Sequence, residues 1–513
     1  VVLDPGLGLL RHPVSTRNAQ AQAYFDQGLK LVFAFNHEAA IRSFERAFEL
    51  DPKLAMAQWG IALALGPNIN MPMELPAHKR AYAALQKAIA LEPYASPAER
   101  DYIGALSKRY SADPDADLGP LQAAYAKAMK VVVRRQPRDD DAAVLYAESL
   151  MDLDPWKYWS ADGTPAPGTE EIITVLQRVL KRNPDHIGAN HYYIHAVEAS
   201  PHPEWALASA RRLAVLAPSA GHLVHMPAHI YIRTGNYLRA AAANVAAVEA
   251  DERRVAKGEQ SFYLVVYYGH NLHFLAVADA FAGRSHGAIA AASKLYDIEA
   301  PRLKEVPEVD GFLMAKELVL VEFARWDEIL ALPEPAFEAP MTGAMWHFAR
   351  TLALAAKGRA AESKAEAVKF AQAAATLTRT MGYGNNDAAG IAAVAAPYLD
   401  GRLALMRGDT AAAIASLRKA VAAEDALAYD EPPGWYLPSR EPLGAALLRA
   451  RDYSAAEQVF RDELVRHPAS GRALFGLHAA LVGEGRAKEA AAVERRFRHA
   501  WRGADTQLDV AAL

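Results

Sequence analysis

A repeating succession of short helices is the feature that most limits how this chain can fold. Alanine-rich segments with helical spacing of their apolar residues follow one another from end to end, and Gly, Asn-Pro or Asp-Pro separates them at short intervals. Alternating runs of β-branched residues are nearly absent. The pattern predicts an all-α protein, and 513 residues with 52% apolar content favour a modular chain over a single core.

The segment that ends at Pro52 gives the frame of the repeat. Counted from residue 21, Gly28, Ala40, Phe44, Ala47 and Pro52 occupy positions 8, 20, 24, 27 and 32 of a unit of about 34 residues. Small residues let two helices approach closely, the aromatic ring fills the remaining space, and proline ends the second helix. The frame therefore predicts a helix–turn–helix unit.

The same frame recurs near the C-terminus, where Gly444, Leu447, Ala456 and Phe460 precede Pro468. This pattern resembles the tetratricopeptide repeat (TPR) superfamily, and the resemblance covers most of the chain. It implies an all-α superhelix, or solenoid, of helical hairpins. It also implies that the first helix of each hairpin lines a concave groove, which usually binds a peptide or a partner protein.

Two segments interrupt the repeats and predict long loop insertions, at residues 152–168 and 429–440. Both are rich in Pro and Trp, so each either lines a site or is a linker anchored by a buried Trp. We expect three groups of repeats: N-terminal repeats at 1–136, central repeats at 137–300 and C-terminal repeats at 301–513.

Seven of the seventeen histidines fall into three short motifs of the central repeats. The motifs are His191 and His195; His222, His225 and His229; and His270 and His273. Spacings of three and four residues place each motif on one face of a helix. Aligned through Pro218, Gly235 and Gly283, all seven occupy positions 2, 5 or 9 of first helices, which face the groove in TPR proteins. First helices pack about 8–10 Å apart, so the motifs predict one metal-binding patch.

Other polar residues near these motifs are candidates for supporting roles. Glu198 follows His195 by one turn, and it is expected to bind the metal, to orient an imidazole or to act as a catalytic residue. Tyr192 and Tyr268 are candidate catalytic groups that hold or reduce a substrate. Asn190 and Asn271 are candidates for hydrogen bonds to the ligands.

The absence of cysteine restricts the metal to nitrogen, oxygen or thioether ligands. Many histidines and one well-placed carboxylate favour copper over a carboxylate-rich di-iron centre, with zinc or iron as alternatives. Met226 lies within the densest motif, but beside Pro227 it is expected to be a core residue.

Three functions follow as hypotheses. The first is a metalloenzyme, with oxidative chemistry favoured, that takes a small-molecule substrate in the groove. The second is a carrier or store for copper or zinc, and the third is a scaffold for a peptide or protein partner.

Charge and hydropathy argue against two classes of partner, nucleic acids and membranes. A formal net charge of -4 without a basic region argues against a nucleic-acid partner. No apolar segment approaches the roughly twenty residues needed to cross a bilayer, so no membrane partner is expected. Because the chain opens with Val1 and has no cysteine, a periplasmic or secreted location is expected. The acidic run Asp139-Asp140-Asp141 is expected to be the solvated start of a helix.

Overall fold

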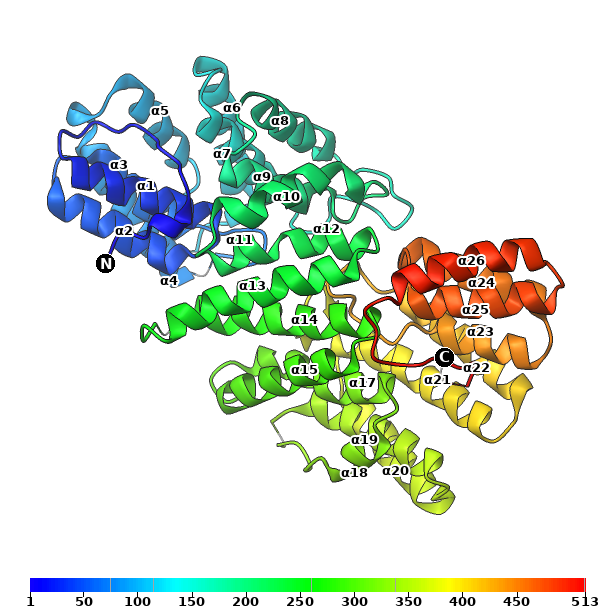
Figure 1. The fold of residues 1–513 in the computed structure, drawn as a ribbon. Helices are drawn as coiled ribbons and strands as arrows, with labels where there is room; N and C mark the ends of the chain where they lie inside the picture. Colours follow the sequence, from blue (N-terminus) through cyan, green and yellow to red (C-terminus); the bar gives the residue numbers. More distant parts are fainter. Residues whose placement is uncertain (74, 114, 260, 337, 512) are drawn as a thin grey trace. The chain divides into compact units, whose positions relative to one another are not determined.

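The computed structural model describes residues 1–73, 75–113, 115–259, 261–336, 338–511 and 513. The chain forms two compact units (Figure 1): Val1–Ile230 with Ala246–Tyr268, and Tyr231–Val245 with Gly269–Leu513. Helices dominate both units, as predicted. In the described residues, only β1 (Gly382–Tyr383) and β2 (Asn386–Asp387) are strands, and they form one short antiparallel pair.

Unit 1 consists of helices that pack on their neighbours in chain order. They are α1 (Ala19–Phe33), α2 (His37–Leu50), α3 (Ala55–Ala64), α4 (Leu75–Ala90), α5 (Pro97–Leu106), α6 (Leu118–Arg135), α7 (Asp140–Met151), α8 (Thr169–Arg182), α9 (Ile187–Val197), α10 (Leu207–Leu216) and α11 (Gly221–His225). Two further helices contribute residues to both units: α12 (Pro227–Arg233) and α13 (Tyr237–Val255).

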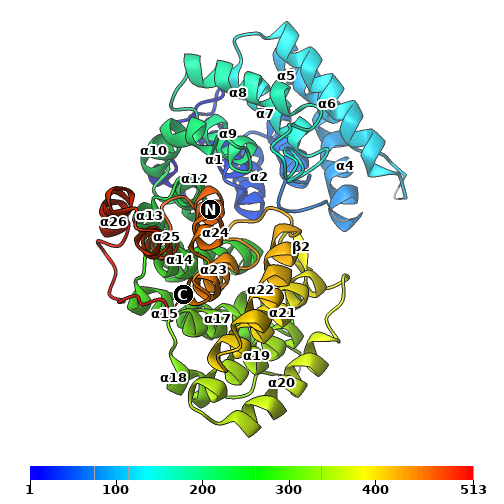
Figure 2. The same ribbon diagram turned by 90° about the vertical axis from the view of Figure 1, so that its right-hand side faces the viewer.

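Unit 2 is built in the same way, and Figure 2 shows several of its helices, among them α21 and α22, running side by side. Its helices are α14 (Gly269–Phe281), α15 (Ser285–Glu299), α16 (Asp310–Leu313), α17 (Ala315–Glu322), α18 (Trp326–Ala331), α19 (Pro340–Ala356), α20 (Ala360–Ala374), α21 (Ala388–Met406), α22 (Thr410–Asp425), α23 (Arg440–Arg449), α24 (Tyr453–Arg466), α25 (Gly471–Gly483) and α26 (Ala487–Ala500).

An aromatic ring between two glycines joins three consecutive helices and explains the repeat frame. The buried ring of Phe44 on α2 lies against Gly28 on α1 and Gly60 on α3, so closely that a Cβ at either glycine would approach it to 2.5 or 2.6 Å. Phe460 on α24 repeats this contact in unit 2 with the glycines of α23 and α25. The predicted fold, an all-α array of TPR-type helical hairpins, is confirmed.

Both predicted loops are confirmed as well. No helix lies between α7 and α8 at residues 152–168, and α22 ends at Asp425 before α23 begins at Arg440. The division into three groups of repeats stays a prediction, because the two compact units do not test it. Among the described residues, no helix has both the length and the apolar composition needed to span a membrane.

The contact between Gly28 and Phe44 gives a first prediction. We expect Gly28→Ala to lower the free energy of unfolding by about 1–3 kcal/mol, the usual effect of overpacking a buried contact. Urea unfolding followed by circular dichroism measures the change.

Gly104→Ala is the matched control, because a Cβ on this glycine of α5 would meet nothing within 4 Å. Its higher helix propensity should raise the free energy of unfolding by about 0.5–1 kcal/mol. Equal effects of the two substitutions would contradict the proposed packing.

Candidate metal centre

Three helices of unit 1 bring five of the seven predicted histidines together. His191 and His195 lie on α9, His222 and His225 on α11, and His229 on α12. Pro227 separates α11 from α12, since proline cannot continue a helix as a hydrogen-bond donor but suits the first position of the next one. Met226, at this break, is buried in the core as expected.

These imidazoles are buried rather than displayed on an open groove. Each of the five histidines is at most 3% exposed. We expected these rings to form a patch on an open groove, and this expectation is wrong. The rings form a cluster, but they face each other in the interior of unit 1. A buried polar ring needs a partner, so the cluster must be satisfied internally or by a ligand.

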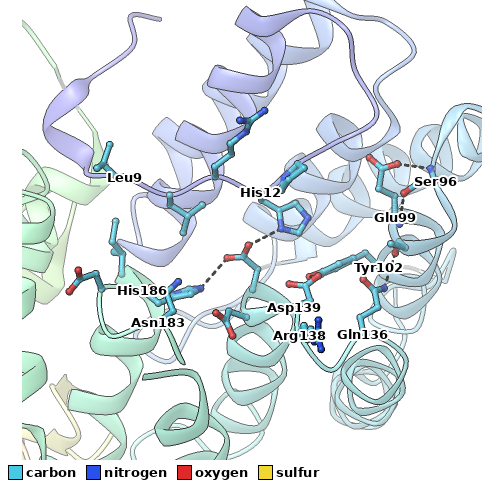
Figure 3. A pocket seen from close by; sticks show the side chains of 18 residues that line it. Leu9, His12, Ser96, Glu99, Tyr102, Gln136, Arg138, Asp139, Asn183 and His186 are labelled. Atoms are coloured by element: carbon cyan, nitrogen blue, oxygen red, sulfur yellow. Dashed lines mark hydrogen bonds and ion pairs between the residues drawn. The ribbon is translucent and has the colours of Figure 1, made fainter. Parts of the chain in front are cut away.

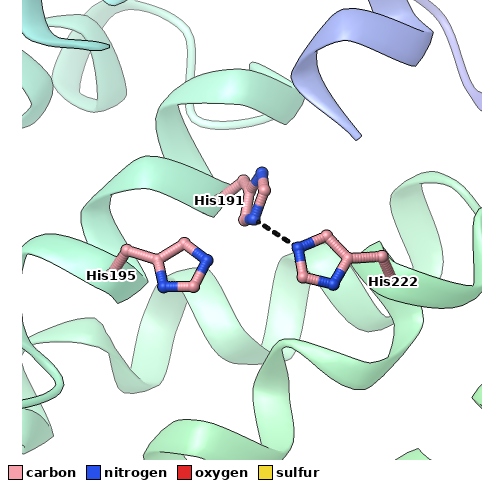
Figure 4. Close-up of side chains that lie close together, drawn as sticks. All are labelled: His191, His195 and His222. Atoms are coloured by element: carbon pink, nitrogen blue, oxygen red, sulfur yellow. Dashed lines mark hydrogen bonds between the residues drawn. The ribbon is translucent and has the colours of Figure 1, made fainter. Parts of the chain in front are cut away.

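His191, His195 and His222 converge on one point (Figure 4). One ring nitrogen from each lies within 4.8 Å of the other two. Nε2 of His191 and Nε2 of His222 are 3.1 Å apart. Two imidazole nitrogens bound to one ion at about 2.0–2.1 Å would be about 2.9 Å apart at a right angle and about 3.4 Å apart at the tetrahedral angle. The observed distance falls between these values.

Hydrogen bonds at Nδ1 orient the rings of His191, His195 and His229. In each ring they leave Nε2 as the nitrogen that faces the other histidines. His191 Nδ1 donates to the carbonyl oxygen of Phe33 at 2.7 Å. Nδ1 of His195 and Nδ1 of His229 donate to the two carboxylate oxygens of Glu198, each at 2.6 Å. A neutral ring that donates from Nδ1 keeps a lone pair on Nε2. Glu198 thus orients two imidazoles, as carboxylates commonly do beside bound metals, and does not need to be a ligand.

The unpaired nitrogen of His195 is the main sign of a ligand. Nε2 of His195 is buried and has no hydrogen-bond partner in the described part of the chain. Leaving such an atom without a partner costs about 1–3 kcal/mol. Nε2 of His229 lies 2.8 Å from Nε2 of His225, which makes a second pair of facing nitrogens. The rings of His195 and His229 are 5.7 Å apart and connect the two groups.

Burial and charge set the protonation states that metal binding requires. Burial lowers the pKa of His191 well below its usual value, and the neighbouring His195 and His229 lower it further. Burial also lowers the pKa of His195. Burial alone would raise the pKa of Glu198, but the charges and hydrogen bonds of His229 and His195 outweigh it and lower that pKa. A lowered pKa favours the neutral form of His191 and His195, and neutral imidazole is the form that binds a transition metal.

Phe35 covers the cluster from the turn between α1 and α2. Its ring centroid is 4.6 Å from that of His191, 5.4 Å from that of His222 and 6.0 Å from that of His195. Phe35 has a φ of 57° at the end of α1. Five glycines with φ of 73–80° occupy the corresponding position of other helices: Gly235, Gly283, Gly358, Gly408 and Gly485.

A bulky residue in this left-handed conformation is strained, and such strain collects at functional sites. The ring of Phe35 encloses three of the histidines, which a glycine at this position could not do. The sequence contained the signal, because Phe35 stands at position 15 of the first repeat, where Gly235 and Gly283 stand in theirs.

The loop at residues 152–168 contacts the histidine cluster through Trp156 and is attached to α9 through Trp159. Trp156, with a φ of 65°, places its half-buried ring edge-to-face against His195 at 5.3 Å. Nε1 of Trp159 donates to the carbonyl oxygen of Ala196 on α9. Trp156 thus lies against the histidine cluster, and Trp159 joins the loop to α9 although it is only half-buried.

The tyrosines around the cluster differ in part from those predicted. Tyr192 contacts His191 at a centroid distance of 5.3 Å, as expected. The hydroxyl of Tyr268, however, donates to Glu252, whereas Tyr263 accepts the backbone N–H of His222 and Tyr267 packs on its ring at 4.5 Å. A π-helical turn at Leu264–Tyr268 explains the difference, because its extra residue changes which side chains face α11.

Asn190 also differs from expectation. Its amide donates to the carbonyl oxygens of Pro184 and His186, so it supports the start of α9 instead of an imidazole. Asn271, the other amide candidate, is buried in unit 2.

His270 and His273 lie on α14 in unit 2. His273 is buried, and its ring contacts Phe312 and Tyr436 at 5.6 and 5.5 Å. Burial lowers its pKa to about 4, and its Nε2 has no hydrogen-bond partner in the described residues. Tyr436 belongs to the second predicted loop, whose Trp435 is a buried anchor.

Comparison with known proteins gives no family assignment. No protein-family model matches the chain, and no curated protein matches it.

Among solved structures, yeast Tom70 aligns with 94% of this chain and 93% of its own at 11% identity, with a TM-score of 0.31. The human IFIT1 dimer with PPP-AAAA aligns over 95% and 92% at 14% identity (TM-score 0.31), and the TPR domain of P58(IPK) over 92% and 100% at 12% identity (TM-score 0.23). At these TM-scores we draw nothing from them about function.

The double hydrogen bond to Glu198 gives a second prediction. An amide at this position offers one acceptor oxygen, so in Glu198→Gln one of the two Nδ1–H groups loses its acceptor and the ring no longer holds its Nε2 in place. We expect metal affinity to fall about 10-fold to 100-fold, as for other carboxylates that orient a ligand. Competition with a chromogenic chelator measures it.

Glu204→Gln is the matched control, because Glu204 pairs with His202 on the surface, on the same stretch of chain. It should leave the affinity unchanged. An equal loss in both variants would remove Glu198 from the site.

Phe35 gives a third prediction. Phe35→Gly relieves the strained backbone but removes the ring that covers three imidazoles, so we expect the rate of metal removal by a chelator to rise at least tenfold. Arg451→Gly is the control, because Arg451 has a φ of 60° at the same position of a hairpin in unit 2 and is exposed. It should change stability by less than about 1 kcal/mol. Unchanged release from Phe35→Gly would contradict the covering role.

Proposed function

We propose that this chain is a TPR-type metal-binding protein in which His191, His195 and His222 bind a transition-metal ion inside unit 1. The observation that carries the proposal is the convergence of three buried imidazoles within 4.8 Å, with Nε2 of His195 lacking any protein partner in the described residues. His225 and His229 form an adjoining pair that can bind a second ion or relay a proton.

The donor set supports copper as the metal. Three imidazoles and no thiolate suit copper or zinc, and copper binds nitrogen ligands most tightly among the divalent first-row metals. Glu198 uses both oxygens to accept protons from imidazoles, which is unlike the bridging carboxylates of di-iron centres. Zinc is the second choice and iron the third.

The surroundings of the site favour oxidative chemistry on a small molecule. Bound copper would supply one-electron redox chemistry. Phe35 and Trp156 cover the imidazoles and limit the access of water. Tyr192 and Tyr267 place oxidisable rings beside His191 and His222. Because the five histidines are almost completely buried, a substrate that reaches them must be small.

The same enclosure also supports a second candidate function, a carrier or store for copper or zinc. A carrier needs no substrate and benefits from complete burial of the ion. The third hypothesis, a scaffold for a protein or peptide partner, requires no metal and follows from the fold alone.

Metal content tests the proposal directly and is the fourth prediction. Full-length protein purified without added metal should contain at least one transition-metal ion per chain by mass spectrometry. The triple substitution His191→Ala, His195→Ala and His222→Ala should lose it, together with several degrees of thermal stability, because ligand binding to the folded state alone stabilises it.

The control carries His202→Ala and His499→Ala, which replace two exposed histidines. It should retain the metal. Less than about 0.1 ion per wild-type chain, even after incubation with copper or zinc, would refute the metal site and leave the scaffold.

Oxygen uptake separates the enzyme from the carrier. Copper-loaded protein with ascorbate as electron donor should consume oxygen faster than the triple variant does. Rapid, complete transfer of copper to a chelator without oxygen uptake would favour the carrier.

A further inference from the structure

A second cluster of polar side chains lines a cavity of about 440 Å³ in unit 1 (Figure 3). The cavity lies where α5, α7 and α9 begin, and residues 9–13 of the N-terminal segment form one wall. The acidic run 139–141 starts α7, as predicted, but the expectation that it is solvated is wrong for Asp141. That residue is only 9% exposed and is surrounded by polar partners.

Asp141 accepts hydrogen bonds from two histidines. Nδ1 of His12 lies 2.8 Å from one carboxylate oxygen, and Nε2 of His186 lies 3.1 Å from the other. The tautomer of His186 is fixed, because its Nδ1 accepts the backbone N–H of Ala189 and its proton must therefore be on Nε2. His186 thus holds Asp141 in position.

His12 faces the two aspartates with one ring nitrogen. Its Nδ1 lies 2.8 Å from a carboxylate oxygen of Asp141, a separation that two ligand atoms of one ion also have, so an ion bound here would replace the proton that the two atoms share. The residue is 8% exposed and lines the cavity. Its backbone is held on both sides, since its N–H donates to Asp26 and its carbonyl oxygen accepts from Gln22. These two backbone hydrogen bonds and the bond to Asp141 hold the His12 side chain in place in the cavity wall.

Asp139 completes the group. Its two oxygens accept the N–H of Ala142 at 3.0 Å and the hydroxyl of Tyr102 at 2.7 Å. Each oxygen still has a second lone pair. One ligand atom each of His12, Asp139 and Asp141 lies within 4.8 Å of the other two.

The charge of the cavity favours a cation. Five carboxylates line it against two guanidinium groups. The carboxylates are Glu99, Asp139, Asp140, Asp141 and Asp185, and the guanidinium groups are those of Arg11 and Arg138. Asp140 is paired with Arg182 outside the lining, and Glu99 accepts hydrogen bonds from Ser15 and Ser96, which leaves the other two aspartates of the run for an ion.

We propose that this cavity is a divalent-cation site, separate from the polyhistidine centre, with His12, Asp139 and Asp141 as its protein ligands. One imidazole and two carboxylates form a harder donor set than three imidazoles, and they suit Mn²⁺ or Zn²⁺. Three protein ligands leave coordination positions open, and the cavity has room for a small oxygen-containing ligand on the ion.

Binding of Mn²⁺ to the full-length protein tests this site, and it is the fifth prediction. Free Mn²⁺ gives an electron paramagnetic resonance signal that disappears on binding. Mn²⁺ is also the divalent ion that histidine-rich sites bind most weakly, so it reports on the harder site. We expect about one Mn²⁺ per chain, with at least tenfold weaker binding in Asp139→Asn and in His12→Ala. Asparagine preserves the helix cap at 139, so α7 should remain folded.

Asp140→Asn is the matched control, because it removes the same charge from the same acidic run without removing a proposed ligand. It should change the dissociation constant less than twofold. Equal weakening by Asp139→Asn and Asp140→Asn would show only a general charge effect and would overturn the site, as would undiminished binding in both Asp139→Asn and His12→Ala. No binding by wild-type protein at millimolar Mn²⁺ would overturn it too.

The outcome is independent of the polyhistidine centre. The triple variant of His191, His195 and His222 should bind Mn²⁺ normally, and Asp139→Asn should retain the transition metal found after purification. Loss of Mn²⁺ binding in the triple variant would assign the ion to the polyhistidine centre and overturn the second site.

Discussion

The carboxylate of Glu198 is the interaction on which the polyhistidine centre depends. It lies at the end of α9 and accepts one proton from His195 on that helix and one from His229 on α12. These two bonds connect helices from neighbouring repeats and fix the same tautomer in both rings. Without a fixed tautomer, buried imidazoles would satisfy each other by exchanging protons. With it, Nε2 of His195 keeps a lone pair that no described residue satisfies, and Nε2 of His229 faces Nε2 of His225 at 2.8 Å.

Helix α9 connects the two sites that we describe. His186 caps its first turn and holds Asp141 of the cavity, while His191 and His195, farther along the same helix, belong to the polyhistidine centre. Phe33 lies beside both, since its ring packs on His186 at 5.5 Å and its carbonyl oxygen accepts from His191. The N-terminal residues of the chain therefore contribute to both sites.

The fold and the clustering of the main histidines could be predicted from the sequence, because both depend on periodicity. Gly28 and Phe44 recur at fixed positions, and the histidine spacings of three and four residues define helix faces. The partners could not be predicted in the same way. Trp156, Tyr267 and His12 reach their sites through a long loop, a π-helical turn and an extended N-terminal segment, none of which follows the repeat. Burial of the histidines also depends on these segments, which explains why an open groove was expected.

Departures from the repeat are thus more informative about function than the repeat itself. A TPR hairpin folds well with glycine after its first helix, and five hairpins of this chain have it there. Phe35 replaces that glycine at a cost in backbone strain of roughly 1–3 kcal/mol. Packing of its ring against three imidazoles offsets this cost only if the imidazoles themselves are held in place, which the hydrogen bonds to Phe33 and Glu198 provide. Strain, enclosure and fixed tautomers therefore belong to one arrangement, and the proposed metal ion would account for all three.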